Sequence, residues 1–173
     1  MTHEDVPDGW PVRITMTTTP TLLSRTAGLA LIRDLGQRVL MREVPGLQSS
    51  APYELPGGPA EAGESALDAC RRHLADQTGR LVQPSALLLA HHIPLTGAET
   101  ARHDFLFDCG QLQPDERWEP DAAGRWRWIL LDDLRDLVEP VTEWRINLAL
   151  DAVEGEPARY LTGVPDFPAL SQA

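Results

Sequence analysis

The residues best suited to chemistry lie close together, in and just before one predicted helix. Glu64 precedes the helix, and His73, Asp76 and Gln77 follow within it at positions i, i+3 and i+4. Side chains at these spacings lie on one side of a helix, so we expect them to converge. Carboxylate and amide oxygens suit hard cations, and an imidazole suits softer ones. A carboxylate or an imidazole can also transfer a proton.

His73 has more than one interpretation. A neutral imidazole can accept a proton from an attacking water and so act as a general base. It can also bind Mn²⁺ or a later transition metal better than Mg²⁺. The simpler alternative, which we favour, is a solvated histidine with no role, because helix surfaces commonly carry histidine and no supporting carboxylate can be assigned from the sequence.

The wider segment from Leu55 to Leu81 resembles the Nudix box of metal-dependent pyrophosphohydrolases. That pattern runs glycine, five residues, glutamate, seven residues, then Arg-Glu-apolar-x-Glu-Glu-x-Gly-apolar. The matching positions are Gly58, Glu64, Arg72, Leu74 and Gly79, and the upstream Leu55-Pro56-Gly57-Gly58 also looks like the loop usual in the family. Three acidic positions of the pattern are altered here, to His73, Asp76 and Gln77.

The resemblance implies a fold, a reaction and a set of roles. The fold would be an α/β/α sandwich with a mixed β-sheet in a single domain. The reaction would be hydrolysis of a nucleoside diphosphate linked to another group, with Mg²⁺ or Mn²⁺. The metal would be held by the Gly58 carbonyl, Glu64, Asp76 and Gln77; catalytic roles would fall to Glu64, His73 and Asp76; and Arg72 and Gly79 would give structural support.

The altered positions leave two other functions open. Loss of two carboxylates weakens attraction to a divalent ion in a reaction that depends on charge stabilisation, so slow hydrolysis or altered specificity is expected. A catalytically inactive Nudix-fold protein that binds a ligand or supports a partner is the alternative. A third reading keeps an enzyme but changes its reaction, because one fold can host unrelated chemistry.

The elements that must position these residues follow from periodicity and turn signals. Ser65 to Thr78 is the clearest helix, with a capping-box-like start at Ser65 and Asp68 and a stop at Gly79. Its predicted buried stripe is Leu67, Cys70 and Leu74. The other predicted elements are strands at 12–16, 26–33, 37–44, 86–93, 103–109 and 126–131, a helical turn at 132–137 and a helix at 142–153.

Composition limits the remaining classes. The chain has 173 residues, which suits one core, and we expect an N-terminal arm at 1–20, a Nudix domain at 21–156 and an irregular C-terminal tail at 157–173. A net charge of −11 disfavours nucleic acid, and no apolar run suggests a membrane span, so a cytoplasmic protein is expected. The predicted partner is a small phosphorylated, nucleotide-like molecule, and a homodimer is left open.

Several residues outside the box are further candidates. Asp104 and Asp108 lie on a predicted strand where this fold often places another acidic ligand. Tyr53, Trp126 and Trp128 have rings that can stack on a base, although aromatic residues in strands more often belong to the core. Cys70 and Cys109 lack a zinc-like spacing and are predicted to be small core residues.

Overall fold

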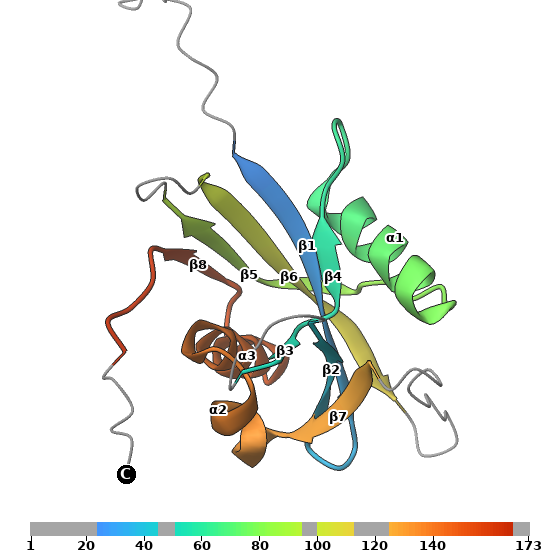
Figure 1. The fold of residues 1–173 in the computed structure, drawn as a ribbon, viewed down its shortest axis with the longest axis vertical. Helices are drawn as coiled ribbons and strands as arrows, with labels where there is room; N and C mark the ends of the chain where they lie inside the picture. The colour runs from blue at the N-terminus through green and yellow to red at the C-terminus, as the bar shows by residue number, and fades with distance from the viewer. Residues whose placement is uncertain (1–23, 45–50, 95–99, 113–124, 168–173) are drawn as a thin grey trace, which may run out of the picture.

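One mixed β-sheet with helices on both faces forms the body of the protein (Figure 1). The computed structural model describes residues 24–44, 51–94, 100–112 and 125–167. The predicted strand at 12–16 and the arm at 1–20 lie outside them. Within the described residues, no helix is both long and apolar enough to cross a membrane.

The first two strands form the predicted hairpin. β1 (Arg25–Asp34) pairs antiparallel with β2 (Arg38–Glu43). Asp34 Oδ1 accepts hydrogen bonds from the backbone N–H groups of Gly36 at 2.8 Å and Arg38 at 3.0 Å, which closes the turn. Positive φ falls on Gln37, at 55°, and not on the glycine beside it.

The remaining strands extend this hairpin in both directions. The sheet order is β3-β2-β1-β6-β5-β8, with β4 paired to β1 and β7 paired to β2. β6 runs parallel to β1, and β8 runs parallel to β5. The bounds are β3 Tyr53–Glu54, β4 Gly57–Pro59, β5 Ala86–Ile93, β6 Arg102–Leu112, β7 Trp126–Leu130 and β8 Arg159–Thr162.

Two hydrophobic clusters cover the two faces of the sheet and confirm the predicted sandwich. Ala30 and Ile32 of β1 pack in one cluster with Cys70 and Leu74 of α1 (Ala66–Thr78). Leu31, between them in sequence, packs in the other cluster with residues of α3 (Pro140–Val153). The short helices η1 (Leu131–Asp133) and α2 (Leu134–Leu137) connect β7 to α3.

The caps of α1 explain why the helix prediction succeeds. Ser65 Oγ accepts from the backbone N–H of Asp68 at 3.1 Å, and its own hydroxyl donates to Asp68 Oδ2 at 2.7 Å. Gly79 ends the helix in the left-handed conformation, with φ of 69°. In the predicted stripe, Cys70 and Leu74 are buried and Leu67 is half-buried.

Three short strands were not predicted. β3 and β4 lie in a segment read as a loop, where Pro56 and two glycines hide any strand pattern. The prediction of an irregular tail was wrong over Arg159–Thr162, because this segment pairs with β5 in the sheet. Only four residues take part, and three of them are exposed, so they show no apolar alternation.

Close packing of three backbones brings α1 against the sheet. A Cβ atom added at Gly28 of β1 would lie 1.8 Å from the carbonyl oxygen of Ala66 in α1. A Cβ at Gly57 of β4 would lie 2.2 Å from the carbonyl oxygen of Gly28. Only glycine at these two positions allows α1, β1 and β4 to pack this closely.

We expect Gly28→Ala to destabilise the fold by about 3 kcal/mol, because the backbone of α1 must move away from β1. Gly36→Ala is the matched control, since its Cβ would approach no described atom more closely than 3.4 Å. Urea denaturation of both variants measures the difference. Equal stability of the two would contradict the close-packing interpretation.

Candidate functional site

A cavity of about 470 Å³ lies beside the box segment. Its walls come from the start of β1 and β6, from β4, and from the first turn of α3. The box contributes Gly57, Gly58, His73 and Gln77 to the lining. This volume lies within the range of roughly 300–1,000 Å³ that is usual for small-molecule sites.

His73 and Gln77 bind the backbone of β4. The ring Nε2 of His73 lies 2.9 Å from the carbonyl oxygen of Pro59, so this nitrogen carries the proton and donates it. Gln77 Nε2 donates to the carbonyl oxygen of Gly57 at 3.1 Å, and its Oε1 accepts from the N–H of the same residue at 3.4 Å. These two side chains therefore fasten α1 to β4, and His73 is not the idle solvated histidine that we favoured from the sequence.

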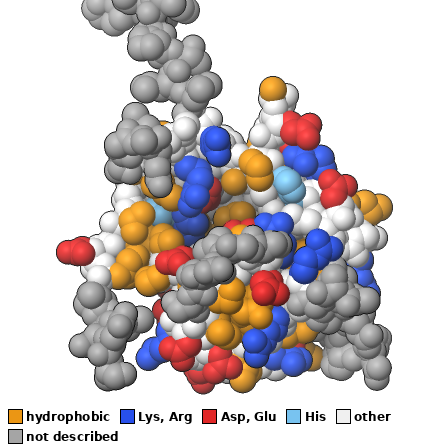
Figure 2. All heavy atoms as spheres, in the orientation of Figure 1, with side chains coloured by type: hydrophobic (Ala, Val, Ile, Leu, Met, Phe, Trp, Pro, Cys, Tyr) orange, Lys and Arg blue, Asp and Glu red, His pale blue; other side chains and the backbone are white. Residues whose placement is uncertain are grey.

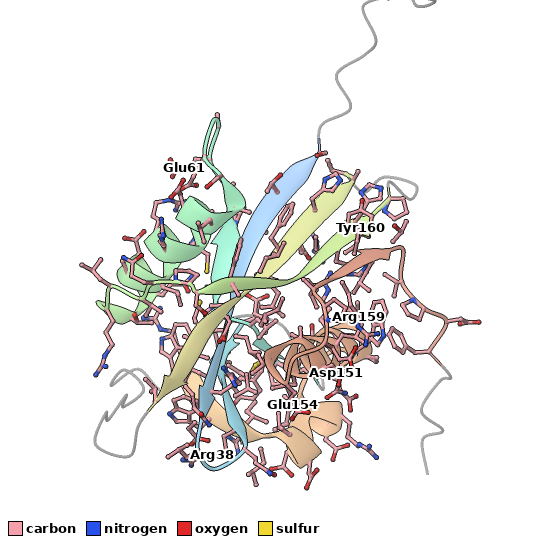
Figure 3. The ribbon with its side chains drawn as sticks, turned by 180° about the vertical axis from the view of Figure 1, so that it is seen from behind. Arg38, Glu61, Asp151, Glu154, Arg159 and Tyr160 are labelled. Atoms are coloured by element: carbon pink, nitrogen blue, oxygen red, sulfur yellow. The ribbon has the colours of Figure 1, made fainter. Side chains whose placement is uncertain are left out.

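Glu64 is held by the arginine of the motif. Arg72 donates from Nε to Oε1 at 2.8 Å and from Nη2 to Oε2 at 2.7 Å. The backbone N–H of Glu61 donates to the same Oε2 at 2.8 Å, and Figure 3 shows Glu61 in the loop ahead of α1. The hydrogen bonds from Arg72, with that from the backbone, lower the pKa of Glu64 to about 2. Arg72 thus fixes the direction of an ionised carboxylate.

The four candidate side chains do not all line one cavity. Gln77 lines both the main cavity and a smaller neighbouring cavity of about 200 Å³. Asp76 is exposed and lines only the smaller one, together with Arg42 and Arg125. Glu64 lines neither cavity. The helical spacing is as expected, but His73 and Gln77 are bonded to the backbone of β4, and Glu64 is bonded to Arg72.

The end of the motif differs from the family pattern. An apolar residue should follow Gly79, and that position is Arg80. Leu81, the predicted end of the box, is 89% exposed and belongs to neither hydrophobic cluster.

The candidates outside the box separate into different environments. Asp104 lines the cavity, whereas Asp108 accepts from Arg33 Nη2 at 3.0 Å and from the N–H of Gly110 at 2.9 Å. Tyr53 lines the main cavity. The aromatic core interpretation holds for Trp126, which is 5% exposed, and for Trp128, which packs against the same cluster.

Among the polar residues of the cavity wall that sequence reasoning missed are Arg25, Arg102 and Arg145. The first two lie at the beginning of strands, where arginine is unremarkable. Arg145 left a signal, because it stands between Trp144 and Ile146 on a helix read as apolar at those positions. A charged residue on a buried helix face needs a partner, and here it is Asp104.

The family model described as NUDIX domain matches residues 22–151. The chain belongs to the Nudix family. Membership supports a hydrolase that acts on pyrophosphate bonds, the reaction implied by the box. No curated protein matches the sequence.

Solved Nudix structures share the fold at low sequence identity. A MutT protein from Methanosarcina mazei Go1 is 20% identical with a TM-score of 0.57, covering 80% of this chain and all 100% of that one. A UDP-X diphosphatase is 21% identical with a TM-score of 0.63, covering 84% and 70%. An ADP-ribose pyrophosphatase from Streptococcus suis 89-1591 is 18% identical with a TM-score of 0.53, covering 80% and 98%.

Nudix hydrolases generally use a divalent metal, but the box of this chain does not form a preassembled site for one. Over the described part of the chain, no group of three or more His, Cys, Asp or Glu side chains converges closely enough to hold an ion. Glu64 is already paired with Arg72, while His73 and Gln77 are bonded to β4. A metal would have to compete with these bonds.

We expect the double substitution His73→Glu with Gln77→Glu to lower the melting temperature without metal. It removes both bonds to β4 and places two carboxylates at i, i+4. Added Mg²⁺ should then raise the melting temperature of this variant more than that of the unmodified chain, because the ion binds only the folded state.

The control for this experiment is His73→Ala with Gln77→Ala, which removes the same bonds without adding carboxylates. Its melting temperature should not respond to Mg²⁺. If neither variant gains a metal response, the site has diverged at more than these two positions.

The pH dependence of stability should reveal the Glu64–Arg72 pair. The folded-state pKa of Glu64, about 2, lies below its usual value of 4.5, so the pair stabilises the fold fully above pH 4.5. That contribution disappears as the pH falls from 4.5 toward 2. Melting temperatures of Glu64→Gln should therefore fall less steeply over this interval than those of the unmodified chain. If the melting temperatures of the two proteins fall in parallel over this interval, the lowered pKa of Glu64 is contradicted.

Proposed function

We propose that this Nudix chain slowly hydrolyses a nucleoside diphosphate linked to another group. The observation that carries the proposal is the cavity of about 470 Å³, which has box residues on one side and arginines on the other. Guanidinium groups match phosphate geometry and offset its charge, so a cavity with these walls suits a phosphorylated ligand. Tyr53 lines the same space and offers a ring on which a base can stack.

The comparisons favour this class of substrate. The similar UDP-X diphosphatase and ADP-ribose pyrophosphatase are both named for a nucleoside diphosphate joined to a second group. Slow turnover follows from the bonds that His73 and Gln77 make to β4, since these positions supply no carboxylate. In such a reaction, lost charge stabilisation lowers the rate.

The same bonds favour a second candidate, a Nudix-fold protein that binds this ligand without hydrolysing it. Fastening α1 to β4 stabilises the cavity wall and needs no metal. The two candidate functions share the ligand and differ only in whether it is hydrolysed, so one panel of compounds can distinguish a hydrolase from a binding protein.

The test is a panel of nucleoside diphosphate derivatives, including ADP-ribose and UDP-glucose, incubated with the full chain and Mg²⁺ or Mn²⁺. We expect slow release of nucleoside monophosphate, measured by chromatography, and faster release with Mn²⁺ because an imidazole and an amide replace two carboxylates. Binding of the same compounds without any product would support the second candidate.

A matched pair of variants excludes a contaminating enzyme. Glu64→Gln should lower the rate at least about tenfold, equal to ~1.4 kcal/mol of activation free energy. Glu154→Gln, an equivalent change at the C-terminal end of α3, should leave it unchanged. Equal rates in both variants would show that the box of this chain does not perform the reaction.

A further inference from the structure

Four arginines line the cavity of a chain whose net charge is −11. Arg42 forms an ion pair with Glu54, so its charge is offset locally. The other three, Arg25, Arg102 and Arg145, stand where β1 meets β6 and the beginning of α3. We call these three residues the arginine wall. In Figure 2, arginine side chains group on this face of the molecule.

Two members of the arginine wall stand side by side. Arg25 and Arg102 are register partners in the parallel pair of β1 and β6, so their side chains leave the sheet on the same side. Arg25 makes no ion pair with any other residue of the described segments. Like charges placed in register repel, and an anion bound between them would relieve that repulsion.

A single carboxylate serves the other two arginines of the wall. Asp104 Oδ2 lies 3.0 Å from Arg102 Nε and 2.9 Å from Arg145 Nη2. Arg145 is only 4% exposed, and the ion partner of its Nη2 among the described residues is this same carboxylate. The three arginines of the wall thus have one carboxylate, Asp104, paired with two of them, which leaves these four residues with a net positive charge.

His91 fixes the orientation of the Arg145 guanidinium. Arg145 Nε donates to His91 Nδ1 at 2.8 Å, and His91 Nε2 donates to the carbonyl oxygen of Gly163 in turn, at 2.6 Å. Burial lowers the pKa of His91, and the charge of Arg145 lowers it further. His91 is therefore a neutral acceptor that holds the guanidinium without offsetting its charge.

The first turn of α3 also borders the wall, through Val141 and Thr142. It offers few free N–H groups to an anion, because Pro140 has none and the N–H of Thr142 donates to the carbonyl oxygen of Glu139 at 2.8 Å. Glu139 at the N-cap and Glu143 in the first turn are both acidic, so the positive charge at this place comes from the arginine wall itself.

The arginine wall is separated from the box. β4 pairs with one side of β1 and β6 pairs with the other, so Gly58 and Asp104 stand on strands two spacings apart, roughly 10 Å. The two phosphoryl groups of a diphosphate share one bridging oxygen and do not span two strands. A ligand whose diphosphate lies at the box would therefore place another group at the wall.

We propose that the arginine wall binds a second phosphoryl group of the substrate, on the part that is not hydrolysed. The inference rests on the proposed function, and it restricts the substrate class to nucleoside diphosphate derivatives that carry an additional phosphate monoester.

The first experiment measures binding of inorganic phosphate to the full chain without metal, by titration of ¹⁵N-labelled protein. Signals of the arginine Nε–H groups in the wall should shift saturably, while the amides of Gly57 and Gly58 should not. Arg25→Gln and Arg102→Gln should each weaken binding about tenfold, the usual order for a charge-assisted hydrogen bond. Arg135→Gln, the same change on exposed α2, should not weaken it.

No saturable binding, or shifts confined to Gly57 and Gly58, would overturn the proposal. Because the titration needs neither metal nor turnover, an inactive protein that binds phosphate at the wall would refute the proposed hydrolysis alone.

The second experiment separates a substrate phosphate from a free ion. NADP⁺ and NAD⁺ are both dinucleotide diphosphates and differ by one phosphate monoester. NADP⁺ should displace bound phosphate at a concentration about tenfold lower than NAD⁺, and Arg102→Gln should abolish that difference. Equal displacement by both, or displacement by neither, would restrict the wall to free phosphate and overturn the substrate assignment.

Discussion

The contact between α1, β1 and β4 through glycine backbone sets the geometry on which the rest of the site depends. With no Cβ at Gly28 or Gly57, the helix lies against β1 and β1 lies against β4 more closely than side chains would allow. The same closeness lets His73 and Gln77 reach the carbonyl oxygens of β4. The cavity then forms on the other face of β1, where small and apolar side chains leave room beneath α3.

Local signals predicted much of the fold, because they are decided by residues near in sequence. The ends of α1 follow from the Ser65 cap and from Gly79, and the hairpin of β1 and β2 follows from one short turn. The parallel pairing of β1 with β6, or of β5 with β8, joins segments far apart in the chain. Such pairing depends on burial of the whole sheet, and a strand of four residues carries too little pattern to show it.

The box residues could be named from the sequence, but their contacts and the arginines of the cavity could not. Helical spacing placed Gln77 one turn beyond His73, and the resemblance to the family pattern supplied the positions of Glu64 and Arg72. Neither could show which side chains would bind backbone oxygens, because those oxygens belong to β4. The partners of Arg145 come from β5 and β6, elements whose register no spacing rule within α3 describes.

The hydrogen bond from His91 to Gly163 means that the wall of the cavity is fully supported only after the segment beyond α3 has been translated. His91 and Asp104, which contact Arg145, are translated before α3. Gly163 is translated later, after β8. Since domains form from the N-terminal side during translation, a nascent chain ending at α3 would contain the whole family segment and all the buried residues of both hydrophobic clusters. Its buried His91 would still lack that acceptor, so the residue that follows β8 completes the support of Arg145.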